Sequence, residues 1–224
     1  MRPVVRAFAE DVAAHVPLLE PIVEIGSRPA EGQEEVANVR SIFAGRGEYI
    51  GCDIQEGIGV DRVEDIHALS FADSSIGTVL SFDTLEHVAD PLRALQEIHR
   101  VLKPGGVVAI SSVMFFVIHA HPWDYWRFTP EGFSLLLEPF DQKLVLAHGY
   151  ELMPETVFGL AVKGDDPKID ESLLPTTVAA CARWGDGTSV DMGPIRFSVR
   201  DLWKLTLRET RRAAGGRLRS GRGR

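Results

Sequence analysis

Acidic residues and a glycine directly follow three short apolar segments of the sequence. Gly26 ends the first segment, Asp53 ends the second, and Asp65 follows the third with Ile66 beside it. A glycine lets the backbone turn sharply against a ligand, and a carboxylate can accept both hydroxyls of a ribose. An acidic residue beside an aliphatic one can bind the amino group and the flat face of an adenine. Together these residues predict a site for an adenosine-containing cofactor, although each alone would equally suit an ordinary loop.

Two further polar segments could complete such a site. Residues 81–87 follow a fourth apolar segment, and residues 119–128 follow a fifth and are rich in aromatic side chains. A histidine near an aspartate can take a proton from a hydroxyl group, and a cage of Trp and Tyr can hold a cation or a sugar face. Alternatively, the aromatic side chains only fasten a lid onto the sheet. The residues predicted for the acceptor side or as a base are His119, His121, Asp124 and Tyr125.

The spacing His119-x-His121 also raises the idea of a metal site. A structural or catalytic zinc site needs at least three protein ligands, and the sequence places no third ligand nearby. We therefore predict no metal.

The elements that position these residues alternate between strands and helices. Residues 2–16 and 91–102 have helical periodicity, and Asp90-Pro91 is a typical helix start. Alternation of this kind predicts a parallel sheet covered by helices on both faces. The last two strands, 144–147 and 156–162, are joined by a link too short for a helical crossover and should be antiparallel. The expected strands before them are 22–25, 49–54, 60–63, 76–82 and 107–113.

Composition and charge limit the class of protein. The 224 residues include 45% hydrophobic and 25% charged residues and 2 Cys, which is typical of a globular domain without a disulfide scaffold. No apolar run reaches the length of a membrane span, and the N-terminus lacks the pattern of a signal peptide. We expect a cytoplasmic protein.

The basic residues gather at the C-terminal end. Residues 200–224 contain nine basic and two acidic residues, while the whole chain carries a net charge of −8. An acidic body argues against specific nucleic-acid binding. The basic tail could contact an anionic surface, or it could be a solvated helix that docks by its apolar face. The sequence assigns no oligomeric state.

Four motifs are informative as a set: Glu24-Ile25-Gly26, Tyr49-Ile50-Gly51-Cys52-Asp53, Leu85-Glu86-His87-Val88 and Arg100-Val101-Leu102-Lys103-Pro104-Gly105-Gly106. Together they resemble the class I S-adenosylmethionine-dependent methyltransferases, most closely the type 11 methyltransferase domain. The resemblance covers about residues 18–163, and its most specific part is Glu86-His87 followed by residues 100–106. It implies a Rossmann-like, three-layer α/β/α fold with a seven-stranded, mostly parallel sheet and an antiparallel last strand.

The resemblance also implies roles for individual residues and a division of the chain. It implies a methyltransferase domain, which with the N-terminal helix at 1–17 spans residues 1–163. Composition and periodicity predict a linker or loosely packed lobe at 164–199 and a basic helix with a disordered Gly/Arg tail at 200–224. S-adenosylmethionine is the implied cofactor, and a small molecule, glycan or lipid is the expected methyl acceptor. The implied cofactor-binding residues are Glu24, Gly26, Ser27, Arg28, Asp53, Ile54, Asp65, Ile66, Ser81, Phe82, Asp83 and His87.

The first loop departs from the family pattern G-x-G-x-G, because Arg28 and Pro29 follow Gly26-Ser27. Arg28 could pair with the carboxylate of the cofactor, or the pocket could be remodelled and the activity weakened or lost. Two other functions therefore stay open: an inactive, methyltransferase-like binding module and a nicotinamide-dependent oxidoreductase. The second is disfavoured because the first turn lacks G-x-G-x-x-G.

Overall fold

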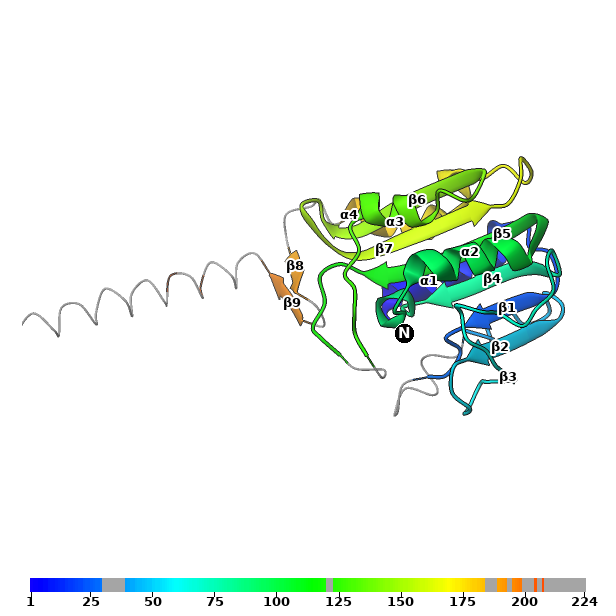
Figure 1. Ribbon diagram of the computed structural model, residues 1–224. Helices are drawn as coiled ribbons and strands as arrows, with labels where there is room; N and C mark the ends of the chain where they lie inside the picture. The colour runs from blue at the N-terminus through cyan, green and yellow to red at the C-terminus, as the bar shows by residue number, and fades with distance from the viewer. Residues whose placement is uncertain are drawn as a thin grey trace, which may run out of the picture.

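A seven-stranded sheet of order β3-β2-β1-β4-β5-β7-β6 organises the chain (Figure 1). The computed structural model describes residues 1–29, 39–119, 123–183, 189–192 and 195–198, together with Lys204 and Leu207. The strands are β1 (Ile22–Ile25), β2 (Tyr49–Asp53), β3 (Arg62–Val63), β4 (Ile76–Phe82), β5 (Leu102–Val113), β6 (Gln142–Tyr150) and β7 (Met153–Val162). A separate two-stranded sheet joins β8 (Ser189–Met192) to β9 (Ile195–Ser198).

The first five strands are parallel, and β7 is antiparallel to both of its neighbours. The prediction of a mostly parallel sheet with an antiparallel last strand is therefore confirmed. Because β1 is the first strand and lies between β2 and β4, the strand order reverses there. Ligands of open α/β sheets bind at the carboxyl ends of strands beside such a switch point.

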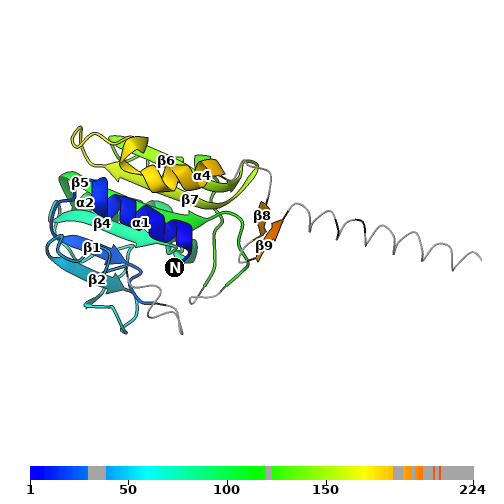
Figure 2. The ribbon, with the colours of Figure 1, turned by 180° about the vertical axis from the view of Figure 1, so that it is seen from behind.

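Helices cover both faces of the sheet. On one face lie α2 (Pro91–Val101) and α3 (Pro130–Leu136), and on the other lie α1 (Pro3–His15) and α4 (Pro175–Arg183) (Figures 1 and 2). Successive residues of β4 belong to the hydrophobic cores on opposite faces of the sheet. Val79 lies in the same core as Leu95 of α2, and Leu80 lies in the same core as Phe8 of α1. This alternation is the period-two geometry of a strand buried on both faces.

Local sequence accounts for the helix starts. Asp90 caps α2 by accepting a hydrogen bond from the backbone N–H of Arg93 at 3.0 Å, and Pro91 takes the first helical position. Thr129 caps α3 in the same way, since its hydroxyl accepts from the N–H of Gly132 at 3.0 Å.

Part of the predicted linker packs against the sheet domain. After η2 (Glu171–Leu173), α4 lies against α1 and β6, and Leu174 joins the core beneath α1. The buried carboxylate of Asp11 accepts hydrogen bonds from the N–H and the hydroxyl of Thr177 at 2.7 and 2.8 Å. The domain boundaries themselves stay a prediction, and nearly all of the basic tail lies outside the described residues.

None of the described helices combines the length and apolar character that crossing a bilayer requires.

Candidate functional site

A cavity of about 1440 Å³ opens at the carboxyl ends of β1, β2 and β4. It is lined by every predicted cofactor residue except Ser81, which is fully buried within β4. The carboxylate-bearing residues Glu24, Asp53 and Asp65, which stand far apart in the sequence, thus face one hollow. Its lining residues among those predicted are Glu24, Gly26, Ser27, Arg28, Asp53, Ile54, Asp65, Ile66, Phe82, Asp83, His87, His119 and Tyr125.

The turn after β1 requires its glycine. Gly26 has a φ of +83°, and a Cβ atom built on it would overlap Oγ1 of Thr84 and lie 2.8 Å from its Cγ2. The N–H groups of Gly26 and Ser27 both donate to the carbonyl of Cys52, at 2.9 and 3.0 Å. A left-handed backbone in contact with a neighbouring side chain is tolerated only without a Cβ.

Glu24 places a buried carboxyl group at the base of this turn. Its side chain accepts a hydrogen bond from the hydroxyl of Tyr49 at 2.7 Å. Burial raises the pKa of Glu24 to about 7. A carboxyl group of this kind can pair with a cationic part of a ligand, which would compensate the cost of its burial.

Two further carboxylates are held in place along the cavity. Asp53 accepts hydrogen bonds from the N–H groups of Arg28 and Gln55, at 3.3 and 3.0 Å. Asp65 is held by His67, whose N–H donates at 2.9 Å and whose Nδ1 lies 2.7 Å away. The backbone hydrogen bond from His67 lowers the pKa of Asp65. Both carboxylates are thus oriented before any ligand binds.

Arg28 leaves the cavity open. Its exposed side chain donates to Oε1 of Gln55 at 2.5 Å and lies beside Gly57 in the loop after β2. The residue therefore borders the cavity without filling it.

Arg2 is a cavity residue that the sequence did not reveal. Its guanidinium makes a two-point contact with Asp83, with Nε–Oδ2 and Nη2–Oδ1 distances of 3.2 and 2.8 Å. It also lies 5.5 Å from the centre of the Phe116 ring. A single arginine at the start of an amphipathic helix carries no local signal, because only the packing of α1 brings it to the end of β4.

Hydrogen bonds to η1 (Leu85–His87) and the residue after it hold the aromatic segment after β5 at the cavity. The N–H of Tyr125 donates to the carbonyl of Glu86 at 2.8 Å, and the indole of Trp126 donates to the carbonyl of Val88 at 2.8 Å. Nδ1 of His87 lies 2.6 Å from the carbonyl of Trp123.

Asp124 orders this segment and does not line the cavity. Its carboxylate accepts from the N–H of His119 at 2.8 Å and from both terminal nitrogens of Arg127, at 2.5 and 2.8 Å. The Arg127 guanidinium holds the pKa of Asp124 well below its usual range. Nδ1 of His119 is 3.3 Å from Oδ2 of Asp124, so the predicted His–Asp arrangement is present for that histidine. His121 lies outside the described residues.

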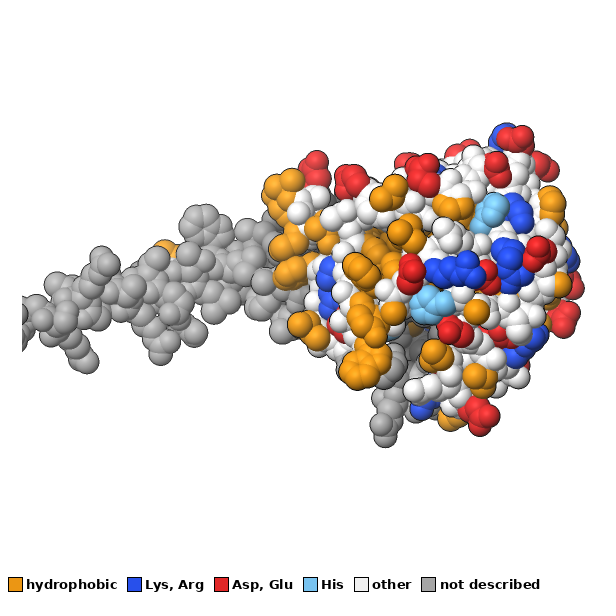
Figure 3. All heavy atoms as spheres, in the orientation of Figure 1, with side chains coloured by type: hydrophobic (Ala, Val, Ile, Leu, Met, Phe, Trp, Pro, Cys, Tyr) orange, Lys and Arg blue, Asp and Glu red, His pale blue; other side chains and the backbone are white. Residues whose placement is uncertain are grey.

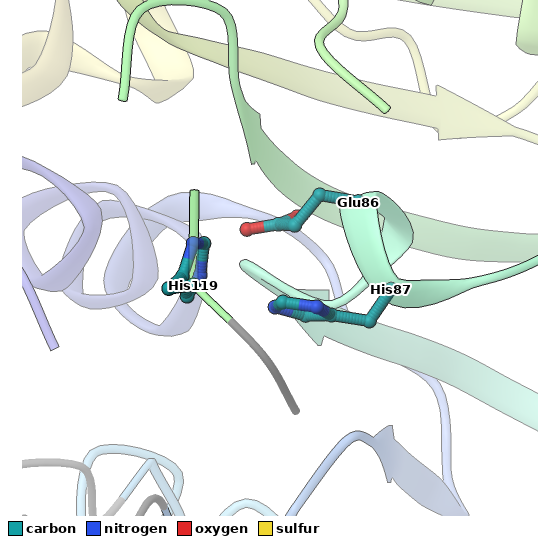
Figure 4. Close-up of side chains that lie close together, drawn as sticks. All are labelled: Glu86, His87 and His119. Carbon is teal, nitrogen blue, oxygen red and sulfur yellow. The ribbon is translucent and has the colours of Figure 1, made fainter. Parts of the chain in front are cut away.

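Glu86 is fully buried beneath the acceptor side. Its Oε2 accepts from the hydroxyl of Ser112 at 2.6 Å, and its Oε1 has no hydrogen-bond partner among the described residues. Burial and the nearby Asp83 raise the pKa of Glu86 to about 7. The side chains of Glu86, His87 and His119 converge, with one ligand atom of each within 4.8 Å of the others (Figure 4). The fold thus supplies the clustered ligands that the sequence around His119 did not show.

The arrangement combines two chemical environments in one cavity. Carboxylates suited to a ribose, an adenine and a cationic group lie along β1, β2 and β3. Imidazoles, a buried carboxyl and aromatic side chains lie on the side of η1 and the segment after β5. Such a cavity can hold a nucleoside cofactor beside a second, smaller molecule.

Comparisons with known proteins agree with this geometry. Residues 34–110 match the family described as "Methyltransferase domain". A ubiquinone biosynthesis O-methyltransferase of Ruegeria pomeroyi is 30% identical, over 53% of this chain and 52% of that protein. An uncharacterized methyltransferase of Mycolicibacterium vanbaalenii is 48% identical, over 62% of this chain and 48% of that protein. The match spans about half the length of these two curated relatives, and 36% of the length of a related protein of Parvibaculum lavamentivorans.

Solved structures share the fold. The phosphoethanolamine N-methyltransferase 2 of Haemonchus contortus, in complex with phosphomonomethylethanolamine and S-adenosylhomocysteine, superposes with a TM-score of 0.54 at 14% identity. That match covers 72% of this chain and 53% of the other. At this identity the likeness concerns the fold alone. The strand order, the matched domain and the sequence relatives together show that the chain is similar to the class I S-adenosylmethionine-dependent methyltransferases.

Proposed function

We propose that the protein transfers a methyl group from S-adenosylmethionine to a hydroxyl group of a small, partly apolar molecule. The observation that carries the proposal is the convergence of Glu24, Asp53 and Asp65 on one cavity at the switch point of the sheet. These residues stand where an adenosine-containing cofactor needs its recognition groups.

The residues of the cavity fit this cofactor. Asp53, already oriented by two backbone N–H groups, would accept the ribose hydroxyls. Asp65 and the buried Ile66 would hold the amino group and the face of the adenine. Glu24 and the turn at Gly26 would meet the methionine part, whose ammonium group suits a buried carboxyl.

When bound, S-adenosylmethionine supplies a methyl group on a positively charged sulfur. In the transfer, a bond forms between the acceptor oxygen and the methyl carbon, the carbon–sulfur bond breaks, and its electron pair stays on sulfur. The protein's main task is to align the acceptor with that bond. The acceptor also loses its hydroxyl proton, and His119, oriented by Asp124 at 3.3 Å, is placed to receive it.

The entrance on the acceptor side favours a partly apolar molecule. Trp123 and Tyr125 line the cavity and are exposed, and Val117 and Ile118 of the same segment after β5 are exposed as well. Figure 3 shows hydrophobic side chains gathered over this part of the surface. Relatives named for O-methylation in ubiquinone biosynthesis support an acceptor of this chemistry. The polar floor formed by the histidines suits its hydroxyl group.

A calorimetric titration tests the cofactor, and a product assay tests the transfer. We expect S-adenosylmethionine and S-adenosylhomocysteine to bind, and NAD not to bind. With a panel of phenols and catechols, methyl transfer should release S-adenosylhomocysteine in the presence of at least one compound. Tight binding of NAD alone would replace this proposal by the oxidoreductase alternative. Binding of S-adenosylhomocysteine without transfer to any acceptor would favour the inactive binding module.

A further inference from the structure

Three potential metal ligands from two separate elements meet at the acceptor side of the cavity. Glu86 and His87 belong to η1, and His119 belongs to the segment after β5 (Figure 4). One ligand atom of each lies within 4.8 Å of the other two. The rings of His87 and His119 meet edge to face, with 4.7 Å between their centres. All three residues line the cavity.

One carboxyl oxygen of Glu86 is buried without a hydrogen-bond partner among the described residues. The residue has no exposed surface, and although Ser112 donates to Oε2, Oε1 has no hydrogen-bond partner among the described residues. Buried polar atoms are almost always paired, because an unpaired one costs free energy. A cation bound at Oε1 would compensate that cost.

The two histidines are oriented as metal ligands usually are. Nδ1 of His87 lies 2.6 Å from the carbonyl oxygen of Trp123, and Nδ1 of His119 lies 3.1 Å from that of Val117 and 3.3 Å from Asp124. A carbonyl oxygen can only accept, so each Nδ1 carries the proton in the neutral ring and Nε2 carries the lone pair. Metal-binding histidines typically donate their other ring N–H to a carbonyl or carboxylate in this way.

We propose that Glu86, His87 and His119 bind a divalent transition-metal ion, of which Zn²⁺ is the type, and that the ion's open coordination position takes the hydroxyl oxygen of the methyl acceptor. Two imidazoles and one carboxylate favour Zn²⁺, Fe²⁺ and related ions over Mg²⁺ and Ca²⁺, which prefer oxygen ligands alone. Three protein ligands with one position open are the arrangement of a catalytic site rather than of a structural one.

The geometry needs only a small adjustment to close around an ion. Bonds of about 2.0–2.1 Å place the ligand atoms of a tetrahedral site about 3.3 Å apart. The spread of at most 4.8 Å between the three atoms therefore has to shrink by no more than about 1.5 Å. Rotation of the side chains supplies this, and η1 and the segment after β5 are already joined by the hydrogen bond from Tyr125 to Glu86.

The ion would change how the acceptor is activated. A hydroxyl bound to a divalent metal has a lowered pKa, so its proton can leave to water and the oxygen attacks the methyl carbon as a metal-bound alkoxide or phenoxide. His119 then acts as a ligand and the metal replaces it in activating the hydroxyl. The acceptor part of this inference rests on the proposed function, whereas metal binding itself does not.

Metal binding can be measured without turnover. Tag-free protein, stripped with a chelator and dialysed, is titrated with Zn²⁺ by calorimetry and with Co²⁺ by its visible absorption. We expect one ion per chain for the wild type. Loss of an outer-shell partner typically lowers metal affinity about 10–100-fold. Glu86→Gln and His119→Ala remove a ligand itself and should each lower the affinity for Zn²⁺ by more than that. His67→Asn is the matched control, because His67 lines the same cavity but lies outside the cluster, and it should bind like the wild type.

The outcomes separate the two proposals. Thermal unfolding checks that each variant is folded, and His87→Gln replaces any variant that is not. A wild type that binds no Zn²⁺, or variants that bind as the wild type does, would overturn the metal site. Titration of the same preparations with S-adenosylhomocysteine tests the proposed function separately. If S-adenosylhomocysteine binds and Zn²⁺ does not, the methyltransferase proposal stands without the metal site. If Zn²⁺ binds and S-adenosylhomocysteine does not, the metal site stands and the methyltransferase proposal fails.

Discussion

Arg2, the residue before α1, and Asp83, the residue after β4, form a two-point ion pair, with N–O distances of 3.2 and 2.8 Å, at the wall of the cavity. Asp83 has a left-handed backbone with a φ of 50°, which is unusual for a residue other than glycine. The hydroxyl of Ser111 donates to the same carboxylate at 3.0 Å. The pair thus ties the N-terminal helix to the part of the site that lies between the cofactor and the acceptor sides.

We therefore expect Arg2→Ala to destabilise the protein by about 1–3 kcal/mol, because it leaves a half-buried carboxylate without its main partner. Urea unfolding measures the effect. Arg6→Ala is the control: Arg6 lies on α1, one turn after Arg2, but its pair with Glu10 is exposed and should contribute less than about 1 kcal/mol. Equal stabilities of the two variants would contradict a structural role for the Arg2–Asp83 pair.

Gly26→Ala should impair both stability and cofactor binding. The added Cβ would overlap the side chain of Thr84, and the alanine would also have to keep a φ of +83°. Gly45→Ala is a matched control, because Gly45 has a φ of +80° but nothing within 4 Å of the point that a Cβ would occupy. The control should cost about 1 kcal/mol for the backbone alone, and Gly26→Ala clearly more.

The double variant Gly26→Ala with Thr84→Ala separates the two causes. It should recover part of the loss, since the nearest contacts are with Oγ1 and Cγ2 of Thr84. If it unfolds as readily as Gly26→Ala alone, contact with Thr84 is not the reason for the glycine.

Glu24 should make stability depend on pH. Its pKa is raised from the ordinary value of 4.5 to about 7, chiefly by burial. Between these values the folded state holds a proton that the unfolded state has released, so the contribution of Glu24 is fully present below pH 4.5 and is lost as the pH rises through 7. At most about 3 kcal/mol is involved.

Glu24→Gln removes this titration. Unfolding free energies of the wild type and the variant, measured by urea from pH 4 to 8, should therefore diverge in favour of the variant as the pH rises. A constant difference across that range would show that folding does not shift the pKa of Glu24.

Asp124→Asn should loosen the segment after β5 without weakening cofactor binding. The carboxylate accepts three hydrogen bonds that order this segment, from His119 and Arg127, and its loss should cost about 1–3 kcal/mol locally. Hydrogen exchange at the amides of His119 and Tyr125 should become faster, while the affinity for S-adenosylhomocysteine stays the same. Unchanged exchange would assign the order of the segment to its aromatic contacts instead.

Much of the fold could be predicted because strand periodicity and helix caps are local signals. The residues that end β1, β2 and β4 were found for the same reason, since strand ends in a parallel sheet share one edge. Ser81, one residue before the end of β4, is fully buried and does not line the cavity.

The remainder of the site depends on contacts between distant segments. Arg2 reaches Asp83 across 81 residues, and Asp11 reaches Thr177 across 166 residues. Glu86 is charged and follows two polar residues and a leucine, so nothing in the local pattern marks it as fully buried. Glu86 is buried because η1 packs beneath the aromatic segment. The hydrophobic periodicity of the sequence does not predict this contact between separate segments.

The most direct test of the account is calorimetric titration of S-adenosylhomocysteine into Asp53→Ala, with Asp73→Ala as the control. Asp73 is an exposed aspartate on the same domain, 77% accessible and paired only at the surface with Arg100. We expect Asp53→Ala to lose measurable binding while Asp73→Ala binds like the wild type. Equal affinity of the two variants would contradict the assignment of the cavity to an adenosine-containing cofactor.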